Sequence, residues 1–324
     1  MAHPPPETFP VSLVIPVRNE AASLPMLLAG IRGQTFPPAE VIIVDGGSTD
    51  GTLDLARSLT ADDARFTLIG QTSGTPGHNR NIGAEAAAHD WIAFTDAGTR
   101  ADPEWLERLV EQASRDASVA VVYGNFEPVE TRMFEQASAL TYVSPGVERE
   151  GGRMRGPAVL SMMLRRHVWA GVGGFPDLRA AEDLIFMERI EKAGFRVAWA
   201  PRATVRWQTQ PDLASTFRRF ALYSNHNVQA GRQWDWHHGV ARHYVFVVAL
   251  LVLLAVLHSP WWWLGIPAWL CARIFLAIWR RRKGRKLLWL LNPARIVVVG
   301  AILITIDLAT FAGWLQAAGG RRPG

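Results

Sequence analysis

Cysteine is almost absent from this chain of 324 residues. The single one, Cys271, lies in an apolar run, so the sequence excludes disulfide bonds within the chain and zinc sites built from cysteines. The chain also lacks a Gly-x-Gly-x-x-Gly turn after a strand and any Gly-x-x-x-x-Gly-Lys-[Ser/Thr] segment. We therefore expect neither a Rossmann dinucleotide fingerprint nor a P-loop.

A signal-peptide pattern is absent as well, because no apolar segment follows a basic start. Residues 1–9 are rich in proline and are predicted to form a flexible leader. Polar and apolar residues are mixed up to about Gln233, as they are in a soluble protein. We expect this part of the chain to stay in the cytoplasm.

The formal net charge is +5, which by itself is compatible with nucleic-acid binding. Much of the excess, however, lies in the basic cluster over residues 280–286, between two apolar runs. Basic residues in that position are typical of contact with anionic lipid headgroups. We predict anionic membrane lipids as partners, and no nucleic acid.

Long apolar runs are confined to the last quarter of the chain. Runs of this length predict about three membrane helices, near residues 240–258, 260–279 and 295–315. We expect an interfacial amphipathic segment before them, over 211–239, and a short tail after them, over 317–324. The positive-inside rule places the basic cluster on the cytoplasmic side of a cell membrane.

Two charged residues lie within these apolar runs. Arg273 is near the end of its run, and we expect its side chain to reach toward the headgroups. Asp307 lies deeper in its run, where an ionisable group has either a functional or a structural role. The pattern does not decide between these two roles.

The N-terminal two thirds alternate short β-branched runs with helical patterns, which indicates an α/β fold with a mostly parallel sheet covered by helices. Ser23 and the pair Asp102-Pro103 are typical of helix starts. The predicted strands are Val11–Ile15, Val41–Val44, Phe66–Ile69, Trp91–Phe94 and Val119–Tyr123.

Two of these strands deliver a carboxylate into a turn, Asp45 before Gly46-Gly47 and Asp96 before Ala97-Gly98. Open α/β sheets bind ligands at the carboxyl ends of their strands, so both acids are candidates for a nucleotide site. Mg²⁺ binds through one or two carboxylates together with substrate phosphates. The alternative is that each acid only caps its own turn.

A third acidic position is Glu182-Asp183, which follows Gly173-Gly174-Phe175 and opens an amphipathic helical pattern. Acids in the first turn of a helix are favoured by the helix dipole, and that is the purely structural interpretation. The functional interpretation makes one carboxylate a general base that removes the proton from an attacking hydroxyl.

These motifs, together with residues 15–20 and Arg80-Asn81-Ile82-Gly83, resemble in order and spacing the family 2 glycosyltransferases. The match covers roughly residues 10–225, and we assign the glycosyltransferase domain to 10–210. The resemblance implies a GT-A fold, a nucleotide-diphosphate-sugar donor, a divalent metal (Mg²⁺ or Mn²⁺) and inversion at the anomeric carbon.

The resemblance also implies a role for individual residues. Asp183 is the implied catalytic base, and Asp96 the implied metal ligand. Glu182, Arg218 and Arg219 are candidates for contact with the diphosphate or the acceptor, although the two arginines suit lipid phosphates equally well. The residues implied to border the nucleotide-sugar are Pro16, Val17, Glu20, Asp45, Gly47, Arg80 and Asp96.

Two positions depart from the family pattern. Gly98 stands where a second acid of an Asp-x-Asp motif is common, which leaves Asp96 to bind metal with phosphates, waters or another side chain. Gly46 stands where a second Asp is frequent, so Asp45 is the main carboxylate of its turn. Neither departure removes the implied base.

The predicted function is a membrane-anchored inverting glycosyltransferase that acts on a lipid-linked or glycan acceptor in the synthesis of envelope polysaccharide or glycolipid. One alternative is a polyprenyl-phosphate glycosyltransferase, whose acceptor needs no strong base. A second is a membrane assembly protein that binds sugar nucleotides without catalysis. A transporter is disfavoured, because three spans offer no repeated bundle.

Overall fold

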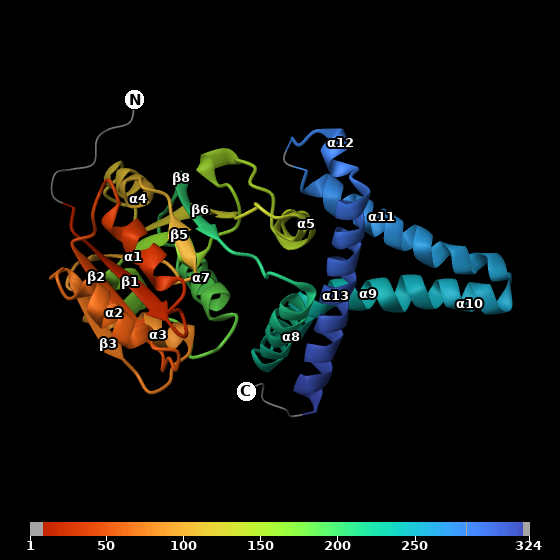
Figure 1. The fold of residues 1–324 in the computed structure, drawn as a ribbon, viewed down its shortest axis with the longest axis horizontal. Helices are drawn as coiled ribbons and strands as arrows, with labels where there is room; N and C mark the ends of the chain where they lie inside the picture. The colour runs from red at the N-terminus through yellow and green to blue at the C-terminus, as the bar shows by residue number, and fades with distance from the viewer. Residues whose placement is uncertain (1–8, 283, 320–324) are drawn as a thin grey trace. The chain divides into compact units, whose positions relative to one another are not determined.

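The computed structural model describes residues 9–282 and 284–319, so nearly all of the predicted leader and most of the predicted tail lie outside it. The chain divides into two compact units. The sheet unit comprises the described residues up to 127 together with 146–208, and the helical unit comprises 128–145 together with the described residues from 209 onward. Figure 1 shows both units along the chain.

The sheet unit is built on one mixed sheet of eight strands in the order β3-β2-β1-β4-β7-β6-β8-β5. The pairs β1–β2, β2–β3 and β1–β4 are parallel, whereas β4–β7, β6–β7 and β5–β8 are antiparallel. The strands are β1 (Val11–Val17), β2 (Glu40–Asp45), β3 (Phe66–Gly70), β4 (Trp91–Phe94), β5 (Thr99–Ala101), β6 (Val121–Pro128), β7 (Met162–Arg165) and β8 (Val197–Trp207).

All five predicted strands are present, as β1, β2, β3, β4 and β6. The structure adds β5, β7 and β8, which supply the antiparallel half of the sheet. β5 and β7 are short, with three and four residues. β8 is long but contains Pro201, which weakens its strand pattern.

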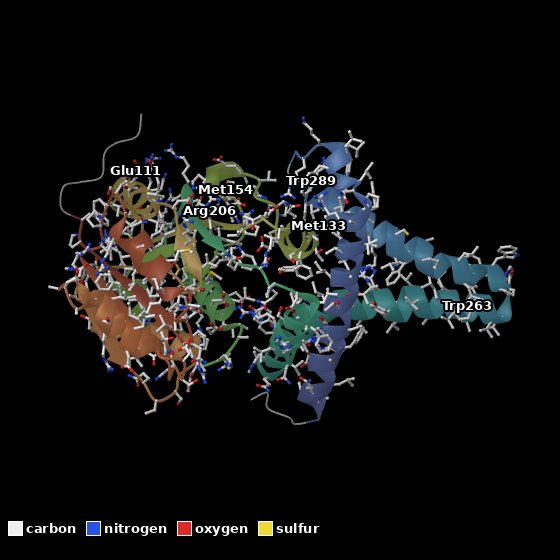
Figure 2. The ribbon with its side chains drawn as sticks, in the orientation of Figure 1. Glu111, Met133, Met154, Arg206, Trp263 and Trp289 are labelled. Atoms are coloured by element: carbon white, nitrogen blue, oxygen red, sulfur yellow. The ribbon has the colours of Figure 1, made fainter. Side chains whose placement is uncertain are left out.

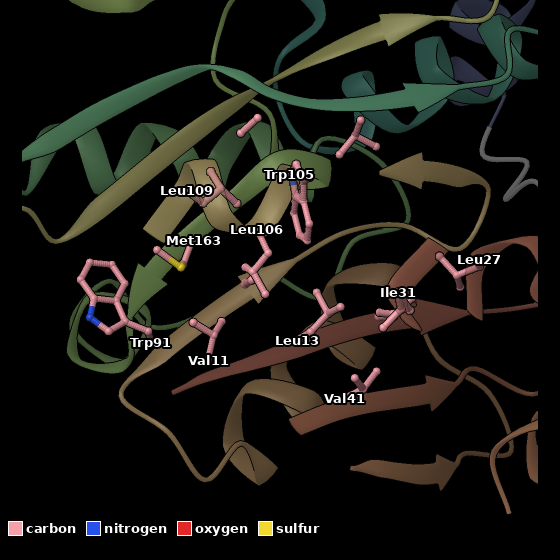
Figure 3. Close-up of a cluster of buried hydrophobic side chains, with 14 of the residues drawn as sticks. Val11, Leu13, Leu27, Ile31, Val41, Trp91, Trp105, Leu106, Leu109 and Met163 are labelled. Carbon is pink, nitrogen blue, oxygen red and sulfur yellow. The ribbon is translucent and has the colours of Figure 1, made fainter. Parts of the chain in front are cut away.

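Helices cover both faces of this sheet. α1, α2 and α4 pack on one face against Leu13, Val41 and their neighbours, a cluster that Figure 3 shows around Trp105. The other face carries α3, α6 and α7. The helices of this unit are α1 (Leu24–Arg32), α2 (Thr52–Thr60), α3 (Pro76–Ala86), α4 (Trp105–Ser114), α6 (Arg166–Gly171) and α7 (Glu182–Lys192), with 3₁₀ turns η1 (Glu150–Gly152) and η2 (Val159–Ser161).

β1 lies in the middle of the parallel strands and is buried on both faces, which explains its nearly continuous apolar sequence. Pro16 is tolerated in this central strand because pairing with β4 ends at Val14, two residues earlier. The strand therefore continues beyond its neighbour and carries the chain to the carboxyl edge of the sheet.

Both predicted helix starts need correction. α1 does begin directly after Ser23, but the Ser23 hydroxyl bonds to Glu20 and does not cap the helix. α4 begins at Trp105, two residues beyond Pro103, and the carboxylate of Asp102 is bound by Arg206 at 2.9 and 3.2 Å. A local contact with Glu20 uses the Ser23 side chain, and a tertiary contact with Arg206 uses that of Asp102.

The helical unit contains three helices long and apolar enough to cross a membrane, at His237–Leu257, Pro260–Arg280 and Pro293–Ala318. Its exposed apolar residues include Trp263, which Figure 2 labels. The unit's elements are α5 (Met133–Tyr142), α8 (Leu213–Gln229), α9 (Gln233–Arg242), the π-helical turn η3 (His243–Val248), α10 (Ala249–Leu257), η4 (Pro260–Leu264), α11 (Gly265–Arg280), α12 (Leu287–Leu290) and α13 (Pro293–Ala318).

The expectation that Arg273 reaches toward headgroups is wrong. Its guanidinium binds both carboxylate oxygens of Asp307, at 2.5 and 3.1 Å, and Tyr244 donates a third hydrogen bond to the same carboxylate at 3.0 Å. Asp307 is buried, so an unpaired charge there would be costly. These contacts assign Asp307 a structural role that joins three apolar helices.

The close approach of α3 to β1 generates a stability prediction. A Cβ atom at Gly83 would lie 2.3 Å from Val14 Cγ1, whereas one at Gly30 in α1 meets nothing within 4 Å. We expect Gly83→Ala to destabilise the protein by about 1–3 kcal/mol through overpacking. Gly30→Ala, the matched control, should stabilise it by up to about 1 kcal/mol. Thermal unfolding of the full chain in detergent measures both, and equal midpoints for the two variants would contradict the prediction.

Candidate active site

The carboxyl edge of the parallel strands holds both of the described non-glycine residues with positive φ. Asn19, at φ 56°, follows β1, and Ala181, at φ 67°, immediately precedes α7. Such backbone conformations cost free energy and persist where the surrounding structure enforces them, often at functional sites. The strained positions flank the acids that the sequence motifs single out.

Hydrogen bonds join the turn after β1 to the turn after β2. The Asn19 amide N–H donates to Ser48 Oγ at 2.8 Å, and Asn19 Oδ1 accepts from the Thr49 N–H at 2.8 Å. The Glu20 N–H donates to Thr52 Oγ1 at 2.8 Å. These contacts hold Asn19 in its left-handed conformation and place Glu20 beside the β2 turn.

Asp45 is buried, with 2% of its surface exposed, and its carboxylate accepts hydrogen bonds from the turn that follows it. Oδ2 accepts from the backbone N–H groups of Gly47 and Ser48 at 3.2 and 3.0 Å, and Oδ1 accepts from the Ser48 hydroxyl. The structure therefore shows the turn-capping role that the sequence left open. Any effect of Asp45 on a ligand would act through the shape of this turn.

Both glycines of this turn are required by close neighbours. A Cβ at Gly47, whose φ is +81°, would lie 2.3 Å from the Thr72 carbonyl oxygen. A Cβ at Gly46 would lie 2.4 Å from Nδ2 of Asn79. The side chain of Asn79 thus occupies the space where the family's second acid would begin.

Asn79 is a residue that the sequence motifs missed. It lies in α3 and is 2% exposed. Its side chain packs against both Gly46 and Gly74, and a Cβ atom placed on Gly74 would lie 2.2 Å from Asn79 Oδ1. Oδ1 has no hydrogen-bond partner among the described residues. The glycine in place of a second acid was the only sequence feature that pointed here, and it did not identify the neighbour.

Arg80 is the centre of the site. Its Nη2 donates to Asp96 Oδ1 at 2.7 Å and its Nη1 donates to Glu182 Oε1 at 3.1 Å. Asp96 follows β4 and Glu182 opens α7, so one guanidinium joins two motifs that are far apart in the sequence. Arg80 and Glu182 are buried, while the side chain of Asp96 is 37% exposed.

Burial and charge act against each other at this ion pair. Burial alone lowers the pKa of Arg80, but the charges of Asp96 and Glu182 more than offset that effect, and its pKa lies above the ordinary value. Burial raises the pKa of Glu182, and the neighbouring Arg80 charge only partly opposes this. Arg80 therefore stays charged and compensates two carboxylates at once.

Asp183 lies next to Glu182 but faces a different environment. Its side chain is half-buried, and its Oδ1 accepts from the Leu184 N–H at 2.8 Å. Because consecutive residues of a helix point in different directions, Glu182 faces the buried Arg80 and Asp183 stands on the more open side. Of the two acids, Asp183 is the one that an external hydroxyl could reach.

Asn81 anchors the Gly173-Gly174-Phe175 segment to α3. Its Oδ1 accepts from the Phe175 N–H at 2.8 Å and from Trp169 Nε1 at 2.9 Å, and its Nδ2 donates to the Phe175 carbonyl at 2.8 Å. The Phe175 ring in turn lies under the Arg80 guanidinium, 5.5 Å away. This segment therefore helps to fix the position of the Arg80 side chain.

The remaining predicted residues divide between the two units. Pro16 and Val17 end β1, and Val17 pairs with Asp45 in the ladder, so both lie at the same edge as the acids. Arg218 and Arg219 lie in α8 of the helical unit, where Arg219 donates to the Tyr223 hydroxyl at 2.6 Å. Their predicted contact with a diphosphate or an acceptor stays a prediction.

The donor set for a divalent metal is small. No group of three His, Cys, Asp or Glu side chains lies close enough to hold an ion within the described part of the chain. Asp96 offers a partly exposed carboxylate, and one of its oxygens is bound to Arg80. This arrangement fits a cation that takes most of its ligands from a bound diphosphate and water.

A cavity of about 320 Å³ lies elsewhere in the sheet unit, between α4, β8 and residues 148–152. Its lining includes Arg108, Arg115, Trp199 and Arg202, and none of the predicted site residues. The cavity is therefore separate from the acids at the carboxyl edge of the strands. Those acids are singled out as the candidate site by their charge and by the strained backbone beside them.

Comparison with known proteins finds matching families and relatives. Residues 12–166 match the family described as Glycosyl transferase family 2, and residues 91–279 match Glycosyl transferase family group 2. The chain is 26% identical to the succinoglycan biosynthesis protein ExoA of Rhizobium meliloti, over 82% of this chain and 84% of that protein. It is 31% identical to the glycosyltransferase AglE of Haloferax volcanii, over 59% and 64%.

Solved structures share the fold. The mannosyltransferase PcManGT of Pyrobaculum calidifontis, in complex with GDP-Man and Mn²⁺, superposes with a TM-score of 0.63 at 20% identity, over 99% of this chain and 90% of that one. TarS of S. aureus, residues 1–349 in complex with UDP, gives a TM-score of 0.53 at 16% identity, over 98% and 93%. These likenesses show the GT-A-like fold.

The Arg80 ion pair generates a prediction on stability. We expect Arg80→Leu to destabilise the protein by about 3–5 kcal/mol, because it leaves the buried Glu182 carboxylate without a cation. The double variant Arg80→Leu/Glu182→Leu should recover most of that loss, since no unpaired buried charge remains. Denaturant unfolding of the full chain measures both.

The control is Arg57→Leu, which breaks the exposed ion pair with Asp54 and should change the free energy of unfolding little. A double variant as unstable as Arg80→Leu alone would show that the lost charge compensation is not the cause.

Proposed function

The chain belongs to the family 2 glycosyltransferases, and we propose that it transfers a sugar, with inversion, from a nucleotide-diphosphate donor to an acceptor hydroxyl at a membrane surface. One observation carries the proposal. Arg80 binds Asp96 and Glu182 together, which places the acid after β4 in one charged cluster with the first turn of α7, where Asp183 lies. This geometry supports a donor site and a base at a single edge of the sheet.

Asp183 is the proposed base. Its carboxylate takes the proton of the acceptor hydroxyl while that oxygen attacks the anomeric carbon of the donor sugar. The new bond forms as the bond from the anomeric carbon to the diphosphate oxygen breaks, and the nucleoside diphosphate leaves with the bonding electrons. Attack opposite the leaving group inverts the anomeric carbon.

Asp96 is the proposed ligand for Mg²⁺ or Mn²⁺. When bound, such a cation would neutralise charge that develops on the leaving diphosphate. Arg80 fixes the Asp96 carboxylate by a hydrogen bond of 2.7 Å, so the exposed oxygen of Asp96 keeps one orientation. The Mn²⁺ in the PcManGT complex supports this proposal.

The proposed donor is a nucleotide-diphosphate-sugar. Two proteins of this fold were determined with such donors, PcManGT with GDP-Man and TarS with UDP-GlcNAc. In this chain the proposed border of the nucleotide is the pair of joined turns after β1 and β2, which include Asn19, Glu20 and the Asp45 cap. Asn79 lies against the same turn.

The proposed acceptor is a lipid-linked or other envelope glycan, with the sheet unit on the cytoplasmic side of the cell membrane. Three apolar helices of the helical unit are long enough to cross a membrane. Relatives include a succinoglycan biosynthesis protein and the O-antigen chain rhamnosyltransferase RfbN of Salmonella typhimurium. A membrane anchor raises the effective concentration of a lipid-linked acceptor at the enzyme.

The assignment of the base is tested with Asp183→Asn. We expect transfer to fall by about 10²–10⁴-fold while donor affinity stays nearly unchanged, because the base acts on the acceptor hydroxyl. The measurement is donor binding and turnover of the full chain in lipid nanodiscs, with nucleotide-sugars screened in Mg²⁺ or Mn²⁺.

The matched control is Glu191→Gln, which removes an exposed carboxylate from the same helix and should leave both quantities unchanged. Equal turnover by Asp183→Asn and the wild type, on a phosphate acceptor, would instead favour transfer to a polyprenyl phosphate. Donor binding without any turnover in the wild type would favour a non-catalytic protein.

The role of the Asp45 cap is tested separately. We expect Asp45→Ala to weaken donor binding about tenfold or more, because three hydrogen bonds that shape the turn are lost. Asp54→Ala, an exposed acid in α2, should leave donor affinity unchanged. Calorimetric titration with the donor measures both affinities, and an unchanged affinity in Asp45→Ala would refute the role of the turn.

A further inference from the structure

The connection between α11 and α13 concentrates positive charge. No Asp or Glu occurs between Asp235 and Asp307, while residues 280–286 carry six basic side chains among seven positions. Within the described residues, we define the basic corner as Arg281, Arg285, Trp289 and Arg295. Figure 2 labels Trp289, which lies in α12.

Two arginines of the basic corner share one aromatic ring. The guanidinium carbon of Arg295 lies 3.6 Å from the centre of the Trp289 ring, and that of Arg285 lies 4.3 Å from it. Stacking on an indole attracts each cation, but two cations on one ring also repel each other. A negative charge close to the two guanidinium groups would therefore stabilise this arrangement.

Protein groups supply only part of that charge. Arg285 is paired with Glu130, while Arg295 donates to neutral partners, the Trp289 carbonyl and Gln136 Oε1. Arg281 Nε donates to the Val143 carbonyl, also a neutral group, at 3.0 Å. Glu130 is thus the one carboxylate among these contacts of the three arginines.

Donor groups remain at the basic corner after these contacts. Arg285 Nη1 and Arg295 Nε are buried and have no hydrogen-bond partner among the described residues. Arg295 as a whole is 5% exposed. Charged donors left unpaired and buried are costly, so they are expected where a ligand completes the site.

The surroundings indicate the source of the ligand. α11 ends at Arg280 and α13 begins at Pro293, so the basic corner lies where two candidate spans end. Leu287, Leu288 and Leu291 are 60%, 88% and 50% exposed on the same short connection. Exposed leucines beside stacked arginines are typical of a segment at the level of lipid headgroups.

We propose that the basic corner binds the phosphate of an anionic membrane lipid, with Arg285 and Arg295 holding the phosphate oxygens and the exposed leucines of this connection contacting the acyl chains. A phosphate offers several oxygens to guanidinium groups of fixed, planar geometry. The inference rests on the proposed membrane anchoring of the helical unit and is independent of sugar transfer.

The titration of a neighbouring group agrees with an excess of positive charge. Burial, and then the adjacent Arg280, lowers the pKa of Arg281 below the ordinary arginine value. A bound phosphate would reverse the effect of Arg280 and complete the charge balance of the connection.

The test is binding of phosphatidylglycerol to the full chain in detergent, counted by native mass spectrometry and titrated at about 0.15 M salt. We expect Arg285→Gln/Arg295→Gln to bind this lipid at least about tenfold more weakly than the wild type, because charge-assisted hydrogen bonds to the phosphate are lost. Arg282→Gln is the matched control. It removes a charge from the same connection, where Arg282 stacks on Trp279 and not on Trp289.

A second variant keeps the test decisive if the double variant does not fold. Arg285→Lys retains the charge but not the planar fork, and we expect it to bind the lipid several-fold more weakly. Equal losses in Arg282→Gln and in the Arg285 variants would overturn the proposal, because they would show a diffuse electrostatic effect.

The source of the phosphate is tested with two further probes. We expect phosphatidylcholine, whose choline carries a positive charge, to compete poorly, and inorganic phosphate to compete only at far higher concentration. Displacement of the lipid by inorganic phosphate at equal concentration would overturn the lipid assignment in favour of a free phosphate site. Because none of these measurements reads sugar transfer, their failure leaves the proposed function untouched.

Discussion

The site depends on one buried cation. Arg80 is held in α3, and its guanidinium compensates Glu182 and Asp96 simultaneously. Without it, the buried Glu182 carboxylate would lose its neighbouring cation, and burial would favour its protonated form. The ion pair therefore lets the chain place acids at the sheet edge while leaving Asp183 and the exposed oxygen of Asp96 available.

Acids at strand ends play two different parts in this protein. Asp45 is enclosed by its own turn and shapes the loop, whereas Asp96 remains partly exposed and faces a cation. The difference follows from their neighbours. Gly47 and Ser48 direct their backbone N–H groups to the Asp45 carboxylate, while Asp96 lies within reach of Arg80 from α3.

Arginines in the helical unit are likewise stabilised in two ways. Arg273 forms an ion pair with Asp307 between apolar helices, so both of these charge-assisted hydrogen bonds stay within the protein. Arg285 and Arg295 instead stack on Trp289 and retain unpaired donors. The first arrangement fastens helices together, and the second is suited to an outside anion.

The sequence by itself determined the parallel strands, the acids at their ends and the apolar helices, because each depends on a local pattern, and it determined the family through the order and spacing of such local motifs. Only the tertiary structure decided that Arg80 joins Asp96 to Glu182, that Asn79 fills the space beside Gly46, and that Arg273 binds Asp307. These contacts join residues far apart in the chain. Their partners follow from packing and charge compensation in the folded core, which no local pattern encodes.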